Sequence, residues 1–293
     1  MAELIRVFPR RTSYTPRDPL AFVGRPPMKI ARPPVDAVSE VHVSVSFTWD
    51  LATAERLRAT WADHYPIVRV GGPALGHMTA GADFTPGRYV NPGVTFTTRG
   101  CNRKCPWCFV PSREGRLIEI PDFRPGHIIQ DNNFPQATRE HQTRVFAMLA
   151  EQPRAAIFGG GIDARLVDQW FADQIRAARV EAVFLAADTA SLLRPLRKAL
   201  DLLSFLGRRK LRVYTLIAYG DDTIDKARAR LEAVWDMGGM PYAQLYQPDD
   251  RYIKYDRAWR DLSRSWIRPA AMFAAHAEQE PATSPLFAGA HNG

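Results

Sequence analysis

The chain has 293 residues and a formal net charge of +8; 46% of its residues are hydrophobic and 24% are charged. These values exclude a wholly disordered chain and a fibrous one. No apolar run approaches the roughly 18 residues of a membrane span, and residues 1–16 carry charge and proline where a signal peptide would be apolar. We therefore expect a cytoplasmic protein without a membrane partner, folded as one large domain or two small ones.

Arginine carries most of the positive charge, because only six of the 39 basic residues are lysine. A general preference for arginine codons accounts for this bias. The alternative is an anionic partner such as nucleic acid or a phosphorylated substrate, which the basic pairs Arg10-Arg11 and Arg208-Arg209 motivate, but codon preference is the favoured explanation.

The amino-terminal third contains two kinds of segment. Residues 1–37 hold seven of the 23 prolines and show little periodicity, so they are predicted to form an extended arm. Residues 41–47 alternate apolar and polar positions as a strand does, Asp50 offers an N-cap to a helix over 51–65, and residues 67–73 form a second strand. The segment 38–75 therefore predicts a small βαβ unit with parallel strands.

From residue 90 to residue 250 strands alternate with helices, which predicts an α/β fold with a parallel sheet or barrel. The six predicted strands cover 94–100, 127–134, 155–161, 182–188, 211–220 and 241–247, and the helices cover 139–151, 165–180, 190–206 and 223–237. Residues 251–270 are expected to add a helical extension. Residues 271–293 are small and polar without a period, which predicts a disordered tail.

All three cysteines lie within eight residues, as Cys101, Cys105 and Cys108. An odd number in a cytoplasmic chain argues against a disulfide framework. A structural zinc site would need a fourth ligand, and the nearest histidines, His77 and His127, lack the short spacing of such sites. A thioredoxin-like pair would use Cys105 and Cys108 and leave Cys101 without a role.

The run Cys101-Asn-Arg-Lys-Cys105-Pro-Trp-Cys108 resembles the signature of the radical SAM superfamily. In that family three cysteines bind three irons of a [4Fe-4S] cluster, and S-adenosylmethionine binds the fourth iron. The resemblance extends over about residues 94–247. It implies a partial (βα)6 parallel, TIM-like barrel, the three cysteines as metal ligands, and Trp107 close to the adenine of the cofactor.

Further cofactor-binding candidates stand at the ends of the predicted strands, where a parallel barrel places its reactive groups. The segment Gly159-Gly160-Gly161-Ile162-Asp163 resembles the family's contact to the methionyl amine, although a tight turn explains three glycines as well. Asp188 stands where the family contacts the cofactor ribose, although it is also a possible helix N-cap. Ala218 and Tyr219 resemble the segment against the adenine, followed by Asp222 where glutamate is common.

Candidates for the substrate side are polar residues on the second and the last strand. Asp131, Asn132 and Asn133 resemble the polar end of the second strand in many of these enzymes. Gln244 and Tyr246 are expected on one face of the last strand and Gln247 on the other. No residue is assigned a catalytic role.

Residues 38–75 are similar to the closing part of the cobalamin-binding domains that precede some radical SAM barrels. The run Val68-Arg-Val-Gly-Gly-Pro-Ala-Leu-Gly and the upstream Ser44 or Ser46 carry this similarity. An Asp-x-His-x-x-Gly motif is missing before Val41. We therefore expect a truncated structural cap that does not bind cobalamin.

The resemblance implies an enzyme with two cofactors, a [4Fe-4S] cluster and S-adenosylmethionine. An electron from an external donor such as flavodoxin or ferredoxin would cleave S-adenosylmethionine to a 5′-deoxyadenosyl radical, which abstracts hydrogen from a substrate. The substrate class stays open between nucleic acids or nucleotides and small molecules or peptides. A non-catalytic, metal-stabilised binding module is the alternative of a different class. Since the signature uses every cysteine, no second cluster is expected.

Overall fold

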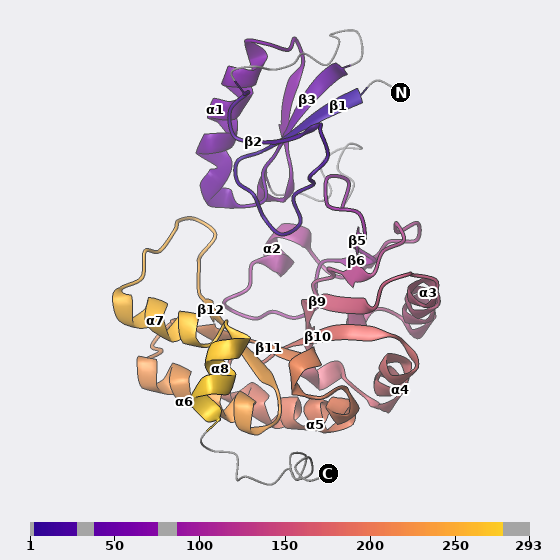
Figure 1. Ribbon diagram of the computed structural model, residues 1–293, viewed down its shortest axis with the longest axis vertical. Helices are drawn as coiled ribbons and strands as arrows, with labels where there is room; N and C mark the ends of the chain where they lie inside the picture. Colours follow the sequence, from indigo (N-terminus) through magenta and orange to yellow (C-terminus); the bar gives the residue numbers. More distant parts are fainter. Residues whose placement is uncertain (1–2, 28–37, 76–86, 278–293) are drawn as a thin grey trace, which may run out of the picture.

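The computed structural model describes residues 3–27, 38–75 and 87–277 (Figure 1). A small sheet with one long helix forms the upper part of Figure 1, and a larger sheet with most of the helices forms the lower part. Among the described residues no helix is long and apolar enough to cross a membrane.

The upper part is a four-stranded parallel sheet with the order β2-β1-β3-β4. Its strands are β1 (Glu3–Phe8), β2 (Ala21–Val23), β3 (Val38–Ser44) and β4 (Val68–Gly71). Helix α1 (Leu51–Ala62) connects β3 to β4. The predicted strand, helix and parallel strand over residues 38–75 are therefore confirmed.

The prediction of an extended arm over residues 1–37 is wrong, because β1 and β2 lie within this range and pair with the rest of the sheet. Ile5 and Val7 are buried opposite Val41 and Val43 of β3. Their alternation along β1 is a strand signal, which the high proline content of the surrounding residues obscured. The cap is thus a larger unit than the one predicted.

Asp50 does not cap helix α1 with its side chain. Its carboxylate instead accepts hydrogen bonds from the Nε and Nη2 atoms of Arg10, both at 2.5 Å. This buried carboxylate therefore holds the loop that follows β1 against the start of α1.

The lower part is a six-stranded sheet with the order β12-β11-β10-β9-β8-β5, in which all neighbours are parallel. Its strands are β5 (Val94–Thr95), β8 (Ile128–Ile129), β9 (Ala156–Asp163), β10 (Val180–Ala186), β11 (Leu211–Ile217) and β12 (Met240–Leu245). The helices that follow β8 to β11 are α3 (Arg139–Ala150), α4 (Gln169–Ala177), α5 (Leu193–Leu203) and α6 (Ile224–Asp236). The predicted α/β class with a parallel sheet is confirmed.

This strand order follows the chain, so right-handed crossovers place all four helices on one face of the sheet. Val183 and Leu185 of β10 and Val213 of β11 belong to the same buried core as residues of these helices. The opposite face carries aromatic rings, with Phe184 stacked on Tyr214 at a centroid distance of 5.0 Å. Strands β5 and β12 are the two edges of the sheet. A curvature that makes it a partial (βα)6 barrel stays a prediction.

Shorter elements complete the fold. Strands β6 (Thr98–Arg99) and β7 (Ile118–Glu119) form an antiparallel pair, and α2 is a short helix over Val110–Glu114. Single 3-10 turns are η1 (Thr48–Asp50), η2 (Pro73–Leu75), η3 (Phe134–Gln136), η4 (Ala164–Leu166), η5 (Ala190–Leu192), η6 (Ser204–Leu206) and η7 (Arg208–Lys210). The strand predicted over 94–100 is thus two short strands, β5 and β6, which pair with different partners.

The carboxyl-terminal helices extend further than predicted. Helix α7 covers Arg257–Ser265 and lies within the predicted extension, whereas α8 covers Pro269–His276 and enters the range predicted to be disordered. The reason is apolar contact, because Met272 is buried in one core with Trp235 and Trp266. Residues 278–293 of the predicted tail lie outside the described residues, as does His77.

The glycine run interrupts β9 instead of ending it. Phe158 pairs with Val183 and Ile162 pairs with Leu185, so three glycines stand opposite a single residue of β10. This bulge brings Gly160 against the neighbouring strand end, where a Cβ atom on it would lie 1.6 Å from the carbonyl oxygen of Asp131. Glycine is therefore required at position 160 for close backbone packing.

Replacing Gly160 with alanine is expected to lower the free energy of unfolding by at least about 3 kcal/mol, or to prevent folding, because the methyl group overlaps backbone that cannot move aside. Gly238→Ala is the control without steric overlap, since no atom lies within 4 Å of its Cβ position, and its φ of +85° adds a backbone strain that position 160 does not have. That variant should cost only about 1 kcal/mol. Urea unfolding followed by circular dichroism measures both, and equal stability of the two variants would contradict this packing account.

Candidate functional site

The three cysteines lie on a loop of residues 100–109 between β6 and α2. At its base, the amide of Cys101 donates to the carbonyl of Gly115 at 3.1 Å, and within it the amide of Cys108 donates to the carbonyl of Cys105 at 3.0 Å. Cys101 and Cys105 are half-buried and Cys108 is exposed. The loop thus has a defined backbone, and its thiols are accessible.

Glu114 of α2 fixes the base of this loop. Its carboxylate accepts hydrogen bonds from the guanidinium of Arg99, from the side-chain amide of Asn132, and from the amide of Gly100 at 3.1 Å. These contacts tie α2, β6 and the end of β8 together. Asn132, predicted on the substrate side, is therefore engaged in holding the cysteine loop.

The sulfur of Cys101 is surrounded by hydrogen-bond donors. The amide of Arg103 and the Nε2 atom of Gln136 both lie 3.4 Å from Sγ, and the Nδ2 atom of Asn133 lies 3.9 Å from it. Asn133 also accepts from the backbone amide of Asp163 at 3.2 Å, which links the loop to the end of β9.

Burial raises the pKa of the Cys105 and Cys108 thiols, and for Cys105 the Asp188 carboxylate raises the pKa further. Both thiols are therefore protonated at neutral pH, and a metal that binds them has to displace the protons. The donor set fits an iron–sulfur cluster in its chemistry, since it offers three accessible thiols and hydrogen bonds to sulfur. In a cubane each thiolate binds a different iron, so the sulfurs need not converge on one point.

Among the described residues, no group of three or more His, Cys, Asp or Glu side chains is arranged to hold a metal ion. His127, considered above as a zinc ligand, is 7% exposed and packs against Gly93, whose Cβ position lies 2.5 Å from its ring. Its position is therefore that of a core histidine.

Trp107 connects the cysteine loop to the ends of three sheet strands. Its Nε1 atom donates to the Oδ2 atom of Asp188 at 3.0 Å, just after β10. Its ring meets the edge of Tyr219, after β11, at 5.8 Å, and Tyr219 in turn meets Tyr246, after β12, at 4.8 Å. Four residues predicted from separate segments therefore form one continuous cluster.

Asp188 does not cap a helix, which was the alternative for this residue. The turn η5 begins after Thr189 without a side-chain cap, and the Asp188 carboxylate faces Trp107 instead. Burial raises the pKa of this carboxyl, and the hydrogen bond from Trp107 partly offsets that effect. Asp188 is thus a largely buried acceptor at the carboxyl end of β10.

A strained turn positions Tyr219. Ala218 has a φ of +64°, and it is the one non-glycine residue with a positive φ among the described residues. Its amide donates to Asp222 at 3.0 Å, and both carboxylate oxygens of Asp222 accept from Arg230 of α6 at 3.0 and 2.7 Å. The Asp222–Arg230 pair therefore holds a backbone conformation that an alanine rarely adopts.

Two arginines that the sequence analysis did not single out lie beside the cysteines. Asp163 accepts from the Nε atom of Arg103 at 2.6 Å and from two side-chain nitrogens of Arg165 at 2.8 Å each. Burial alone would raise the pKa of the Asp163 carboxyl, but these hydrogen bonds outweigh it and hold the pKa below its usual range. The sequence hints at these two arginines only through their positions. Arg103 stands inside the cysteine motif, and Arg165 stands two residues after Asp163.

The remaining substrate-side candidates are placed differently. Asp131 is 2% exposed, and its carboxylate accepts from the amide of Thr97 at 2.6 Å and from its hydroxyl at 2.5 Å, so it stabilises the chain between β5 and β6. Gln247 hydrogen-bonds the backbone of Ile253 and closes a loop. Gln244 is exposed on β12, and Tyr246 alone of this set lies in the Trp107 cluster.

No protein-family model matches the chain, and no curated protein is found to be similar to it. A solved structure of coproporphyrinogen III oxidase (HemN) from Escherichia coli, described as a radical SAM enzyme, is similar over 52% of the chain with a TM-score of 0.36 and 10% sequence identity. The chain spans 40% of that protein's length. A similarity this low carries no weight for fold or activity.

Asp131 gives a pH-dependent prediction. Burial raises the pKa of its carboxyl to about 6, although hydrogen bonds from Thr97 and Thr98 act to lower it. The folded state therefore binds the proton more tightly than the unfolded chain, and the stability that this proton supplies is complete below about pH 4 and lost as the pH rises through about 6.

The Asp131→Asn variant removes this titration and keeps an oxygen that can accept from the Thr97 amide. Relative to the wild type, its free energy of unfolding should gain on the order of 3 kcal/mol between pH 4 and pH 7. Urea unfolding at a series of pH values measures the gain. Parallel pH profiles for the two proteins would show that Asp131 does not titrate in this range.

Proposed function

We propose that the chain is a radical SAM enzyme that binds S-adenosylmethionine where the cysteine loop meets the strand ends. The observation that carries the proposal is the contact of Trp107, which lies within the cysteine motif, with Asp188 and Tyr219. Both partners were singled out from strand ends some 80 to 110 residues further along the chain. The one-sided placement of the helices supports a barrel whose open face carries this site.

In this proposal Cys101, Cys105 and Cys108 hold a [4Fe-4S] cluster. When bound and reduced, such a cluster supplies one electron to the sulfonium of S-adenosylmethionine, which yields methionine and a 5′-deoxyadenosyl radical able to abstract hydrogen from a substrate. The protein supplies binding, orientation and exclusion of water. The reductant is an external donor of the flavodoxin or ferredoxin type.

The side chains near the cysteines match the polar groups of S-adenosylmethionine. The Asp188 carboxylate is an acceptor for the two ribose hydroxyls, and Tyr219 and Tyr246 offer aromatic surface to the adenine. Arg103, Arg165 and Asp163 bring charges of both signs beside the thiols, which suits an amino-acid group with one carboxylate and one ammonium. Gly159, Gly160 and Gly161 precede this charged group, and because a Cβ on any of them would meet atoms of neighbouring residues, we assign them to strand packing and to no direct contact with the cofactor.

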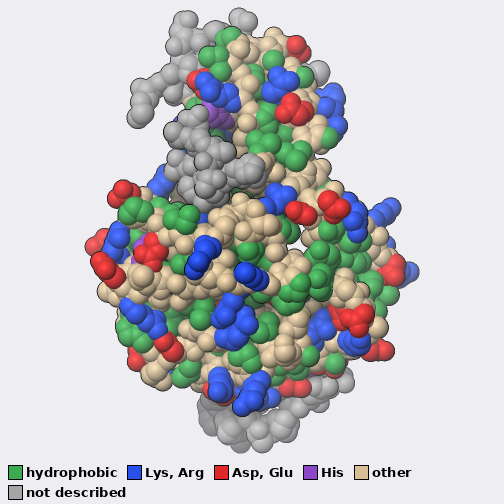
Figure 2. Space-filling model, turned by 180° about the vertical axis from the view of Figure 1, so that it is seen from behind, with side chains coloured by type: hydrophobic (Ala, Val, Ile, Leu, Met, Phe, Trp, Pro, Cys, Tyr) green, Lys and Arg blue, Asp and Glu red, His purple; other side chains and the backbone are tan. Residues whose placement is uncertain are grey.

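The structure gives no separate support to a nucleic-acid substrate. Three of the four arginines in the two basic pairs are engaged, since Arg10 pairs with Asp50, Arg208 lies over the ring of Trp235 at 3.9 Å, and Arg209 lies over Phe273 at 4.7 Å. On the face shown in Figure 2, Lys and Arg side chains are interspersed with Asp and Glu. The substrate is therefore left outside the proposal.

Anaerobic reconstitution with iron and sulfide should load about four irons per chain. After reduction with dithionite, the loaded protein should slowly cleave S-adenosylmethionine to 5′-deoxyadenosine, as followed by chromatography. Cys105→Ala should lose both the iron and the cleavage. Lys104→Ala is the control in the same loop and should retain both. Full cluster loading in Cys105→Ala, or a loaded wild type that never cleaves the cofactor, would contradict the proposal.

A second prediction separates cofactor binding from cluster loading. Trp107→Phe and Asp188→Asn each remove part of the indole–carboxylate contact, and each should weaken S-adenosylmethionine binding about tenfold, or about 1.4 kcal/mol. Their iron content should match the wild type. Asp236→Asn, at the exposed end of α6, is the control. Calorimetry on loaded protein measures the affinities, and unchanged affinity in both site variants would place the cofactor elsewhere.

A further inference from the structure

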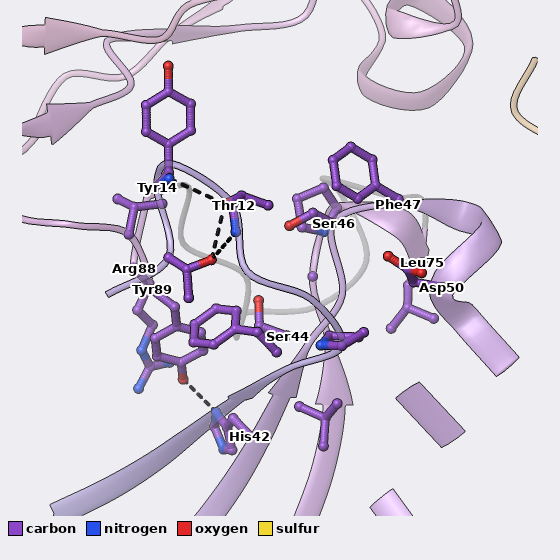
Figure 3. A pocket seen from close by; sticks show the side chains of 18 of the residues that line it. Thr12, Tyr14, His42, Ser44, Ser46, Phe47, Asp50, Leu75, Arg88 and Tyr89 are labelled. Carbon is purple, nitrogen blue, oxygen red and sulfur yellow. Dashed lines mark hydrogen bonds between the residues drawn. The ribbon is translucent and has the colours of Figure 1, made fainter. Parts of the chain in front are cut away.

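A cavity of about 1080 Å³ lies between the amino-terminal sheet and the cysteine-bearing part of the chain (Figure 3). Its wall includes the ends of β1, β3 and β4, together with Phe96, which lies between β5 and β6, and Arg99 of β6. The cavity is distinct from the Trp107 cluster, since its wall includes none of Trp107, Asp188, Tyr219 and Tyr246.

The strand order places this cavity at the sheet's topological switch point. Strand β1 has β2 on one side and β3 on the other, so successive connections leave the sheet in opposite directions. The cavity wall contains Phe8 at the carboxyl end of β1 and Ser44 at the carboxyl end of β3. In open parallel sheets, ligands bind outside the carboxyl ends of the strands at this position.

The end of β4 presents bare backbone to the cavity. No atom lies within 4 Å of the Cβ position of Gly71, whereas a Cβ on Gly72 would lie 2.5 Å from the carbonyl oxygen of Val45. Gly72, with a φ of +118°, is therefore required by the packing of the fold. Gly71 is not, and the space beside it is open. A glycine such as Gly71, with open space at its Cβ position, lets a ligand approach the backbone closely.

Hydroxyl groups and aromatic rings line the same space. Figure 3 shows Ser46 and Phe47 on one side of the cavity and Arg88 and Tyr89 on the other. The hydroxyls of Ser44 and Ser46 form no hydrogen bond with any residue of the described parts of the chain, whereas Phe47 is stacked on Trp49 at 4.9 Å. These groups offer hydrogen bonds and a rigid aromatic surface to a ligand.

Arg88 is a cation of the cavity wall that is available to pair with an anionic ligand. The guanidinium groups of Arg10 and Arg69 are paired with Asp50 and Glu40. Arg88 is exposed, lies over the ring of Tyr89 at 5.2 Å, and forms no ion pair within the described part of the chain. The ring of Tyr89 is in turn fixed through its hydroxyl, which lies 2.5 Å from Nδ1 of His42.

We propose that this cavity binds an anionic, aromatic small molecule of mononucleotide size. The aromatic part packs on the rings of the wall, the anion pairs with Arg88, and the free hydroxyls and the backbone at Gly71 bind polar groups of the ligand. The volume suits a ligand larger than an amino acid, because drug-sized ligands occupy pockets of about 300–1,000 Å³. The cap is then a binding domain, and this inference does not depend on the cysteine loop.

Calorimetric titration of the full chain with FMN, AMP and riboflavin tests the proposal. FMN or AMP should bind with a Kd below about 1 mM, and riboflavin, which lacks the phosphate, should bind at least tenfold more weakly than FMN. Arg88→Gln should weaken binding of the phosphorylated ligand about tenfold and leave riboflavin unchanged. The control Arg197→Gln, on the exposed side of α5, should change neither.

A second variant tests the cavity by steric block, so that the test does not depend on the charge of Arg88 alone. Gly71→Leu places a side chain where the fold leaves open space, so it should retain the thermal stability of the wild type while abolishing binding. Three results would overturn the proposal: no binding of FMN or AMP, binding indifferent to both Arg88→Gln and Gly71→Leu, or tighter binding of hydroxocobalamin than of either mononucleotide. None of these results bears on the cysteine loop, so they leave the proposed function to its own test.

Discussion

The hydrogen bond from the indole of Trp107 to the carboxylate of Asp188 connects the two halves of the candidate site. Without it the cysteine loop would still be anchored at its base, where Glu114 binds Arg99 and Gly100, and by the pair of Arg103 with Asp163, but not to the residue that follows β10. With it, the loop lies over the carboxyl ends of β10 and β11, and Tyr219 packs against the same ring. The proposed chemistry depends on this placement, because the thiols and the groups that would bind the nucleoside have to face one ligand.

The carboxyl ends of two parallel sheets each carry one of the two proposed binding regions. Contacts between the parts include hydrogen bonds: the Tyr14 hydroxyl donates to Gln130 at 2.7 Å, and the Asn91 side chain donates to the carbonyl of Ser13 at 2.9 Å. The rings of Trp49 and Tyr252 also meet, at 5.9 Å. Arg99 belongs to the wall of the upper cavity and, through Glu114, to the base of the cysteine loop. The cap is therefore built into the same polar framework that holds the cysteines.

The sequence was sufficient to predict the alternation of strands and helices and the position of Asp188 and Tyr219 after neighbouring strands, because parallel strands place the residues that follow them at the same end of the sheet. The cofactor-binding role of these residues and of Trp107 stays a prediction. The sequence was insufficient where tertiary contact decides the role of a residue. Asp131 has the chemistry of a substrate ligand but is buried against Thr97. Arg165 binds Asp163 only because the turn after β9 directs it there. Strand β1 was missed since nearby prolines outweighed an alternation of only six residues.

The central claim is that S-adenosylmethionine binds at the cysteine loop, on an iron that has no protein ligand. Electron paramagnetic resonance of the reconstituted, dithionite-reduced protein, recorded with and without S-adenosylmethionine, tests it most directly. The account predicts a reduced [4Fe-4S] signal whose g-values shift when the cofactor is added, with the shift reduced in Asp188→Asn. A signal that the cofactor leaves unchanged, or the absence of any cluster signal, would contradict the account.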